Sequence, residues 1–154
     1  MKTAAITVDF DPNHMRGIAS ILRPSDAVDF ASVPDPMAVA KHYADNGIAV
    51  TVVHNGYVLA VGGVLNLWEG VGEWWSLTTI YAEKYPKQFH KAAKDMIMRA
   101  ELEMKLHRLQ AAIRADNQKA INWHARLGFT NEGIMRAYGV DGTDYFRMAL
   151  TWHS

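Results

Sequence analysis

His124 carries a side chain suited to proton transfer. It lies in residues 116–129, where Asn117 can cap a short helix and Gly128 can end it. An imidazole has a reference pKa of about 6.5, so it can deliver or take a proton at neutral pH. A histidine on a helix face can equally pack against a sheet with one nitrogen bonded. The residues alone leave both interpretations open.

A second group of residues that could bind or react with a ligand is basic. Lys84, Lys87, His90 and Lys91 gather at the start of an expected helix. Unpaired N–H groups at a helix start, together with the helix dipole, favour anions. The cluster is therefore a candidate anion site, although four basic groups near a helix start are also typical of a solvated face.

Residue types exclude several other chemistries. The chain has no cysteine, so disulfides, thiolate metal sites and cysteine nucleophiles are absent. Its seven histidines are scattered, and no spacing with carboxylates suggests a metal site. Sixteen Lys and Arg balance sixteen Asp and Glu, so charge predicts neither nucleic acid nor a membrane surface as partner.

Length and composition predict a single domain spanning residues 1–154. Hydrophobic residues make up 49% of the chain and charged residues 21%, as in globular proteins. The N-terminal apolar run is too short for a signal peptide, and no apolar stretch approaches the roughly 20 residues of a transmembrane helix. A cytoplasmic location is therefore expected.

Periodicity predicts the elements that position these residues. Strands are expected where β-forming residues gather between turn signals, at 4–10, 48–53, 57–67, 73–81, 109–115, 132–140 and 144–152. Helices are expected where apolar residues recur every three or four positions behind a cap, at 12–23, 36–44, 86–106 and 118–127. Pro24 is expected to end the first of these helices.

Connections between these elements predict the sheet. Asn55-Gly56 and Asp141-Gly142 are hairpin turns, which predict antiparallel neighbours. The long helix instead joins the strands at 73–81 and 109–115, which should be parallel with a right-handed crossover. The expected fold class is α/β (α+β), with a central mixed, mostly antiparallel sheet flanked by helices.

Residues 117–129 also carry a family resemblance. Their pattern, Asn-x-x-Ala-x-x-x-(aromatic)-x-x-x-Gly-Phe, resembles the last motif of the GNAT superfamily of N-acetyltransferases, with His124 at the aromatic position. The motif stands shortly before two C-terminal strands, where that family carries it. The order of expected elements is similar to the GNAT fold over essentially the whole chain.

The resemblance implies that acetyl-CoA lies between the strands at 73–81 and 109–115. Its pantetheine arm would pair with free backbone groups near residues 80–82, and its pyrophosphate would rest on the following helix start. Asn117 would contact that arm, or merely cap its helix. The residues placed around the cosubstrate are Ile80, Tyr81, Ala82, Lys87, Gln88, Phe89, His90, Lys91, Asn117, Ala120 and Trp123.

One part of the family pattern is missing. In the family a Gln/Arg-x-x-Gly-x-Gly/Ala loop cradles the pyrophosphate, and the matching positions here are Tyr85, Gln88 and His90. Side chains in place of glycine can block the close backbone approach that a pyrophosphate needs, whereas Lys87 and Lys91 offer compensating charge. Binding of CoA is therefore left open.

The resemblance also implies catalytic roles. His124 stands where many members have a tyrosine thought to protonate the departing thiolate, so it would be the general acid. Glu73 would be the base, acting through water, although its place at a strand start is also typical of a solvated edge. Trp68, Trp74 and Trp75 would wall a substrate pocket or belong to the core.

Two functions follow from these expectations. The first is an acyl-CoA-dependent N-acetyltransferase that moves an acetyl group by direct attack of a primary amine, on a small molecule or a protein. The second is a catalytically inactive GNAT-fold binding or structural protein, similar to glycine-poor GNAT-like chains associated with phage particles. The missing glycines motivate the second function. Exposed strand edges and tryptophans would also suit a homodimer.

Overall fold

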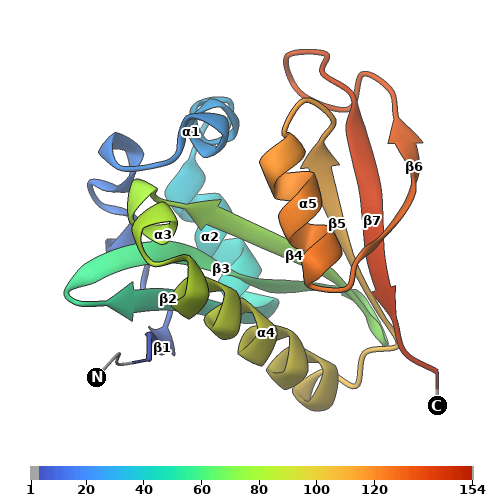
Figure 1. The fold of residues 1–154 in the computed structure, drawn as a ribbon, viewed down its shortest axis with the longest axis horizontal. Coiled ribbons are helices and arrows are strands. Elements are labelled where there is room, and N and C mark those ends of the chain that lie inside the picture. Colours follow the sequence, from blue (N-terminus) through green and yellow to red (C-terminus); the bar gives the residue numbers. More distant parts are fainter. Residues whose placement is uncertain (1–3, 154) are drawn as a thin grey trace.

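A mixed sheet of seven strands forms the centre of the protein, whose computed structural model describes residues 4–153 (Figure 1). Its strand order is β1-β2-β3-β4-β5-β7-β6. The strands are β1 (Ile6–Asp9), β2 (Gly47–His54), β3 (Tyr57–Trp68), β4 (Val71–Thr78), β5 (Arg108–Arg114), β6 (Thr130–Met135) and β7 (Tyr145–Thr151). All neighbours in this order are antiparallel except β4 and β5, which are parallel as predicted.

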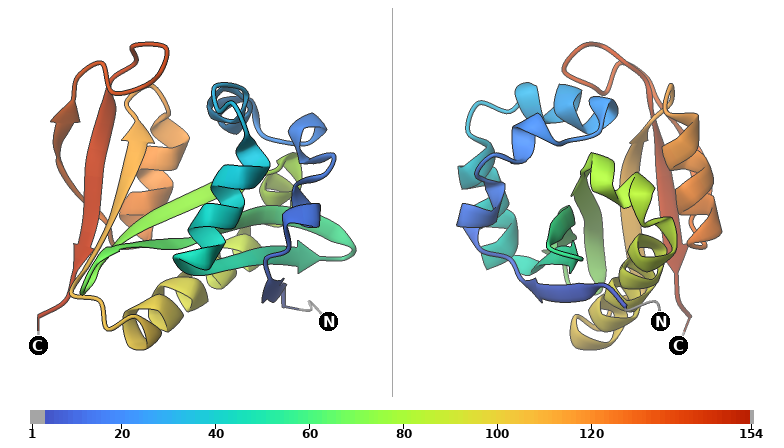
Figure 2. Two further views of the ribbon diagram at one scale, coloured as in Figure 1. Left: turned by 180° about the vertical axis from the view of Figure 1, so that it is seen from behind. Right: turned by 60° about the vertical axis from the view of Figure 1, so that its left-hand side comes forward.

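Helices cover both faces of this sheet (Figures 1 and 2). On one face lie α4 (Pro86–Glu103) and α5 (Gln118–Arg126). On the other lie α1 (Pro24–Ala31) and α2 (Pro36–Asp45), which come forward when the molecule is seen from behind. The predicted fold class, a mostly antiparallel mixed sheet flanked by helices, is confirmed.

Burial explains the position of α4. Phe89, Ala93, Met96 and Ala100 recur at steps of four, three and four along the helix, and all are buried against the sheet. Burial of such an apolar stripe is what stabilises a helix in a folded protein. Lys94, on another face of α4, is exposed.

Local capping explains the position of α5. The side chain of Asn117 accepts a hydrogen bond from the backbone N–H of Ala120 over 3.1 Å, and Gly128 takes a φ of 105° just after the helix. Phe129 is then buried in the core. The cap and the glycine stop predicted for this segment are both confirmed.

The N-terminal region differs from its prediction. Residues 12–23 form two 3-10 turns (Pro12–Met15 and Ile18–Ser20) rather than one helix, because Gly17 between them adopts a φ of 72°. Pro24 begins α1 instead of ending a helix. Proline is favoured at the first position of a helix, so the signal was real but was assigned to the wrong end.

The predicted strand at 73–81 is too long. β4 ends at Thr78, and residues 80–82 belong instead to the short helix α3 (Ile80–Lys84). The hydroxyl of Thr79 accepts a hydrogen bond from the N–H of Tyr81, a helix cap that the β-rich sequence concealed. The strand predicted at 132–140 likewise shifts to β6 (Thr130–Met135), and a loop follows it.

The parallel pair β4–β5 creates the feature on which any site depends. These strands pair at only three positions, Val71 with Arg108, Gly72 with Leu109 and Glu73 with Gln110. Beyond Glu73 they diverge and open a V-shaped gap in the middle of the sheet (Figure 1). The gap exposes strand edges that a continuous sheet would have paired.

Candidate active site

The V-shaped gap contains a cavity of about 240 Å³. Residues 73–76 of β4 and 112–114 of β5 form two of its walls. Asp26, Asp29 and Tyr43, from α1 and α2, close it on their side of the sheet. This space, which we call the inner cavity, is therefore open to three carboxylates, counting Glu73 of β4.

The backbone at the end of β4 is already paired. The N–H of Ile80 donates to the carbonyl of Ile21 over 2.8 Å, and the carbonyl of Thr78 accepts from the N–H of Arg23 over 2.9 Å. The N–H of Ala82 donates to the carbonyl of Thr79. The expectation that residues 80–82 offer free backbone groups is therefore wrong, because the segment before α1 occupies this edge.

The free part of that edge lies further back along β4. Backbone groups of successive strand residues point to alternate edges, so Trp74 and Ser76 face the same edge as Thr78. The pairing with β5 has ended at Glu73. The last pairing, of Glu73 with Gln110, uses the N–H of Trp74, so the first N–H of this edge that is directed into the gap without a strand partner is that of Ser76.

His124 lines the inner cavity and is buried. Its Nδ1 lies 2.7 Å from the carbonyl oxygen of Ala120, which can only accept, so Nδ1 carries the proton and Nε2 is the free nitrogen. Burial lowers the pKa of His124 to about 4, and the nearby Arg23 acts in the same direction. The imidazole is therefore neutral at pH 7 with an unprotonated Nε2, and this state cannot donate a proton to a thiolate.

Glu73 lies at the apex of the gap and is held there by two partners. Arg147 Nη1 donates to its Oε1 over 2.9 Å, and Gln110 Nε2 donates to its Oε2 over 2.9 Å. Its side chain is only 20% exposed, so the expected solvated edge position is wrong. These contacts fix the orientation of the carboxylate.

Asp26 is a cavity carboxyl that the sequence did not single out. It lies on α1, 16% exposed, with Oδ2 3.3 Å from Nε of Arg23. Burial raises the pKa of Asp26 to about 6, although Arg23 acts in the opposite direction. A carboxyl with this pKa can change protonation state close to neutral pH.

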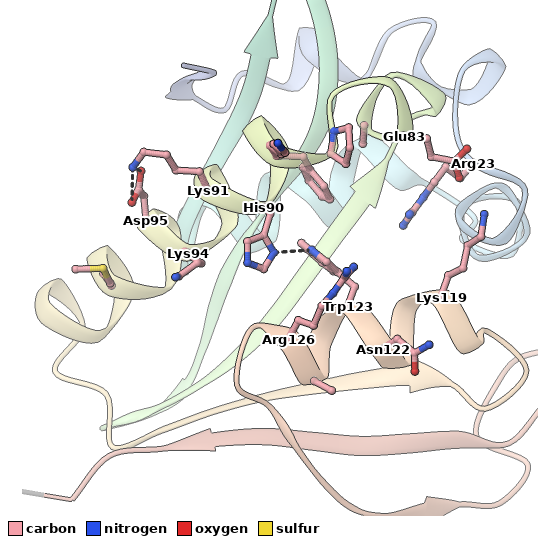
Figure 3. Close-up of a pocket in the computed structure, with 16 residues that line it drawn as sticks. Arg23, Glu83, His90, Lys91, Lys94, Asp95, Lys119, Asn122, Trp123 and Arg126 are labelled. Carbon is pink, nitrogen blue, oxygen red and sulfur yellow. Dashed lines mark hydrogen bonds and ion pairs between the residues drawn. The ribbon is translucent and has the colours of Figure 1, made fainter. Parts of the chain in front are cut away.

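A second and larger space lies on the other face of the gap, between α4 and α5 (Figure 3). This groove, which we call the basic groove, has a volume of about 1280 Å³. Six Lys or Arg side chains line it against two carboxylates, and the cations are Arg23, Lys87, Lys91, Lys94, Lys119 and Arg126. The chain as a whole is neutral, so positive charge is concentrated here.

The start of α4 adds backbone donors to the groove. Pro86 has no N–H, and Tyr85 makes no side-chain cap. The first hydrogen bond into the helix comes from the N–H of Phe89, so the N–H groups of Lys87 and Gln88 find no acceptor within residues 4–153. Unpaired N–H groups at a helix start attract anions.

The residues expected around a cosubstrate are divided between these two spaces. Asn117 and Ala120 line the inner cavity, whereas the basic groove is lined by Ala82, Lys87, Phe89, His90 and Lys91. Trp123 lines both. Three expected residues line neither space, namely Ile80, Tyr81 and Gln88. Tyr81 instead stacks on Tyr57 with ring centroids 4.3 Å apart.

Trp123 and His90 connect α5 to α4 (Figure 3). The indole Nε1–H donates to Nδ1 of His90 over 3.2 Å, and the indole stacks on Phe89 with centroids 4.9 Å apart and planes inclined by 15°. Burial and the neighbouring cations Lys94 and Arg126 lower the pKa of His90, which keeps Nδ1 available as an acceptor. The two helices are thereby joined across the groove.

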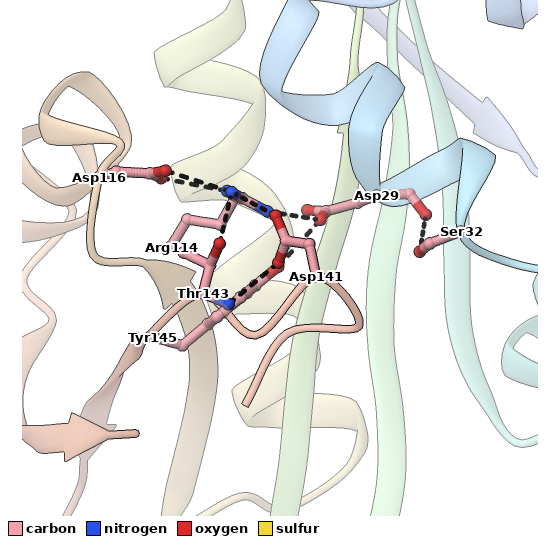
Figure 4. Close-up of polar contacts among 7 residues, drawn as sticks. All are labelled: Asp29, Ser32, Arg114, Asp116, Asp141, Thr143 and Tyr145. Atoms are coloured by element: carbon pink, nitrogen blue, oxygen red, sulfur yellow. Dashed lines mark hydrogen bonds and ion pairs between the residues drawn. The ribbon is translucent and has the colours of Figure 1, made fainter. Parts of the chain in front are cut away.

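Arg114 organises the far rim of the inner cavity (Figure 4). Its guanidinium donates to Asp116 over 3.1 Å and to Asp141 over 3.0 Å, and it lies 3.7 Å from Asp29 of α1. Tyr145 also donates to Asp29, over 2.9 Å. Asp116 is a local partner of Arg114, but Asp29 and Asp141 are distant in sequence, so no local pattern could have revealed the network, which ties α1 to the loop between β6 and β7.

Two further properties concern residues 4–153 only. Their His, Asp and Glu side chains form no cluster of three or more that is arranged to hold a metal ion. None of their helices combines the length and apolar character needed to span a membrane.

Sequence comparison finds no relative: no family model matches the chain, and no curated protein matches it. Comparison of structures gives many. Ard1 from Thermoplasma volcanium superposes with a TM-score of 0.77 and 13% identity, over 99% of this chain and 100% of that one. A spermidine N-acetyltransferase SpeG chimera from Vibrio cholerae and hSSAT gives a TM-score of 0.74 and 14% identity, over 97% of this chain and 96% of that one.

A third similar structure is an Escherichia coli N-acetyltransferase that acts on alanine of a ribosomal protein. It superposes with a TM-score of 0.69 and 16% identity, over 96% of this chain and 93% of that one. Identities at this level establish the architecture and not the activity. The chain has the GNAT fold of these acetyltransferases over nearly its full length, as the sequence motif predicted.

Proposed function

We propose that the protein is a GNAT-type N-acetyltransferase that moves an acetyl group from acetyl-CoA to a primary amine. The observation that carries the proposal is the gap between β4 and β5, which has a basic groove on one face of the sheet and a carboxylate-lined cavity on the other. Such a gap lets an anionic donor and a cationic acceptor approach one reacting point from opposite faces. The fold of known acetyltransferases supports the same activity.

The basic groove fits the phosphorylated part of CoA. Lys87, Lys94, Lys119 and Arg126 supply cationic side chains, and the start of α4 supplies two unpaired N–H groups. Gln88 replaces a family glycine but does not line the groove, so its side chain does not occupy that space. Bound there, acetyl-CoA would supply the activated thioester.

Backbone groups of β4 are suited to stabilise the charge that develops on the thioester oxygen. The N–H group of Ser76 faces the gap beyond the last pairing of β4 with β5, and Ser76 lines the inner cavity. Fixed donors in a site largely closed to water stabilise an oxyanion without reorganising during the reaction. We assign this function to the N–H of Ser76 in place of residues 80–82.

A carboxylate of the inner cavity must take the proton of the ammonium before attack. We propose Asp26, since a pKa of about 6 leaves it ionised at pH 7 yet able to accept a proton. Glu73, the base expected from the sequence, is the second candidate, acting through water, because Arg147 and Gln110 hold its carboxylate in a fixed orientation at the cavity. His124 then has a positioning role, with Nε2 accepting a hydrogen bond from the acceptor amine.

The acceptor is proposed to be a cationic amine, on a small molecule or at a protein terminus. Asp26, Asp29 and Glu73 line the cavity that it would enter. Two of the similar structures carry names that state such acceptors, spermidine and a ribosomal-protein alanine. Spermidine and peptides with an N-terminal alanine are therefore the first acceptors to assay.

Calorimetric titration with acetyl-CoA and with free CoA tests the proposal. We expect micromolar binding to the wild type and about tenfold weaker binding to Lys87→Ala, since one phosphate contact is lost. Lys41→Ala removes the same charge from α2, outside the groove, and should bind as the wild type does. Absence of heat and of thermal stabilisation at millimolar ligand would reject the acetyltransferase assignment.

Two observations favour a second candidate function. Trp123, stacked on Phe89, lines both the basic groove and the inner cavity, and the backbone near Ile80 is already paired. Both features suit a GNAT-fold protein that no longer catalyses and serves as a binding or structural component, such as a virion-associated one. Failure to bind CoA would favour this candidate.

A further inference from the structure

Two residues mark the passage between the basic groove and the inner cavity. Within residues 4–153, Arg23 and Trp123 line both spaces. Arg23 comes from the segment before α1 and Trp123 from α5, so they approach the gap from different elements (Figure 3). Any ligand that spans the two spaces must pass these side chains.

Arg23 is the fixed side of this passage. Its backbone N–H is bonded to the carbonyl of Thr78 on β4, and its side chain is paired with Asp26 at 3.3 Å. Moving the residue would require breaking a backbone contact with the central sheet as well as an ion pair.

Trp123 is the movable side. Its indole is held by one hydrogen bond to His90, by the stack on Phe89 and by an edge contact to His124 with centroids 4.9 Å apart. All three are side-chain contacts, so rotation about the side-chain torsions releases the indole without disturbing α5. In the position observed, the ring also lines a small apolar space of about 30 Å³ beside Phe89, which places it against the sheet at the mouth of the gap.

We infer that Trp123 controls access from the basic groove to the inner cavity, and that its indole must leave Phe89 and His90 before the pantetheine arm of CoA can reach the gap. The inference rests on the proposed function, because it assumes that CoA occupies the groove. It predicts that only the pantetheine half of the ligand is affected by Trp123. The nucleotide half binds outside the passage, on the cations of α4 and α5.

The test compares CoA with adenosine 3′,5′-bisphosphate, which has the nucleotide and lacks the arm. Both are titrated calorimetrically into the wild type, Trp123→Leu and Trp123→Phe. We expect Trp123→Leu to bind CoA about tenfold more tightly, since the closed arrangement no longer competes with binding. Trp123→Phe keeps a ring but cannot donate to His90, and should gain about threefold. Trp68→Leu, at an indole that is 63% exposed and lines none of the three spaces, is the matched control.

Binding of the bisphosphate separates the possible outcomes. Equal affinity of all four proteins for it shows that each variant is folded with an intact groove, and a gain confined to CoA then supports the inference. If Trp123→Leu leaves CoA binding unchanged, or weakens both ligands alike, Trp123 does not control access and the proposed function still stands. If neither ligand binds any of the proteins, the proposed function fails and the inference fails with it.

Discussion

The two faces of the V-shaped gap hold charge in different ways. In the basic groove, Lys87, Lys94, Lys119 and Arg126 form no ion pair within residues 4–153. In the inner cavity each carboxylate lies beside an arginine, and the pairs are Asp26 with Arg23, Asp29 with Arg114 and Glu73 with Arg147.

This difference separates attraction from positioning. Unpaired cations at a surface attract anions from a distance and are screened by salt. Paired carboxylates have little net field, but their oxygens are held in fixed directions by their partners. The groove is therefore suited to capture a ligand, whereas the cavity is suited to orient one.

Removal of the proposed base, which lies on the cavity side, should have the largest effect on activity. With an acceptor found among spermidine and peptides with an N-terminal alanine, Asp26→Asn should lower kcat by roughly a hundredfold or more, a typical loss for a general base. Glu73→Gln should cost less than about tenfold. The thiol of released CoA measures the rate. The rate of the wild type should rise with pH through about 6, as Asp26 ionises, and Asp26→Asn should lose this rise.

Binding to the groove provides the control for that experiment. Asp26→Asn and Glu73→Gln lie on the cavity side and should bind CoA as the wild type does. A larger loss of kcat in Glu73→Gln than in Asp26→Asn would reverse the assignment of the base. Weakened binding of CoA in either variant would mean that the two faces are not independent.

The pH dependence of stability distinguishes two buried groups of the same cavity. The pKa of His124 is lowered to about 4, so its contribution to the free energy of unfolding is complete above pH 6.5 and is lost as the pH falls toward 4. The pKa of Asp26 is raised to about 6, so its contribution is complete below pH 3.8 and is lost as the pH rises through 6. Each effect amounts to about 3 kcal/mol, and between pH 4 and 6 they oppose each other.

Single variants should expose these opposed effects. As the pH falls from 6.5 to 4, the free energy of unfolding of His124→Phe should rise by about 3 kcal/mol relative to the wild type. The variant keeps the stabilisation gained at Asp26 and lacks the loss at His124. Asp26→Asn should become less stable by a similar amount over that range. Urea unfolding at a series of pH values measures both. Parallel pH profiles for the three proteins would show that neither group changes its pKa on folding.

Loss of Arg114 should affect the cavity and spare the groove. Its side chain is 12% exposed, whereas Asp116 and Asp141 are 62% and 45% exposed, so solvent weakens each pair. We expect Arg114→Met to cost about 1.5 kcal/mol of stability and to speed hydrogen exchange in α1 and in residues 136–144. Exchange in α4 should not change. Faster exchange throughout the chain would indicate a general loss of the fold instead.

Sequence reasoning found several local features, misplaced the helix start at Pro24, and missed the features made between distant segments. The cap at Asn117, the stop at Gly128 and the turn at Asn55-Gly56 each depend on a few adjacent residues, and all are present. The end of β4 was misjudged because Thr79 can continue a strand or cap a helix, and pairing with residues 21–23 decides between them.

The chemistry of the site was harder to predict for the same reason. His124 was correctly placed on the helix that faces the gap, yet its low pKa depends on burial that no spacing reveals. Asp26 was not singled out at all, because its raised pKa results from packing of α1 over the gap. In both groups burial is the main cause of the shift in pKa, and burial depends on how segments distant in sequence pack.

Replacement of Asn117 should have the smallest effect on stability, and it tests whether α5 positions side chains on both faces of the gap. Its side chain caps α5, the helix that carries Trp123 to the groove and His124 to the cavity. Asn117→Ala should cost about 1 kcal/mol of stability, while Asn117→Asp, which keeps the accepting oxygen, should cost little. If α5 positions both side chains, Asn117→Ala should also quicken exchange of α5 and reduce kcat, and Asn117→Asp should restore both. Should kcat fall equally in the two variants, Asn117 would act on the acceptor directly, since it also lines the cavity, rather than through the helix that it caps.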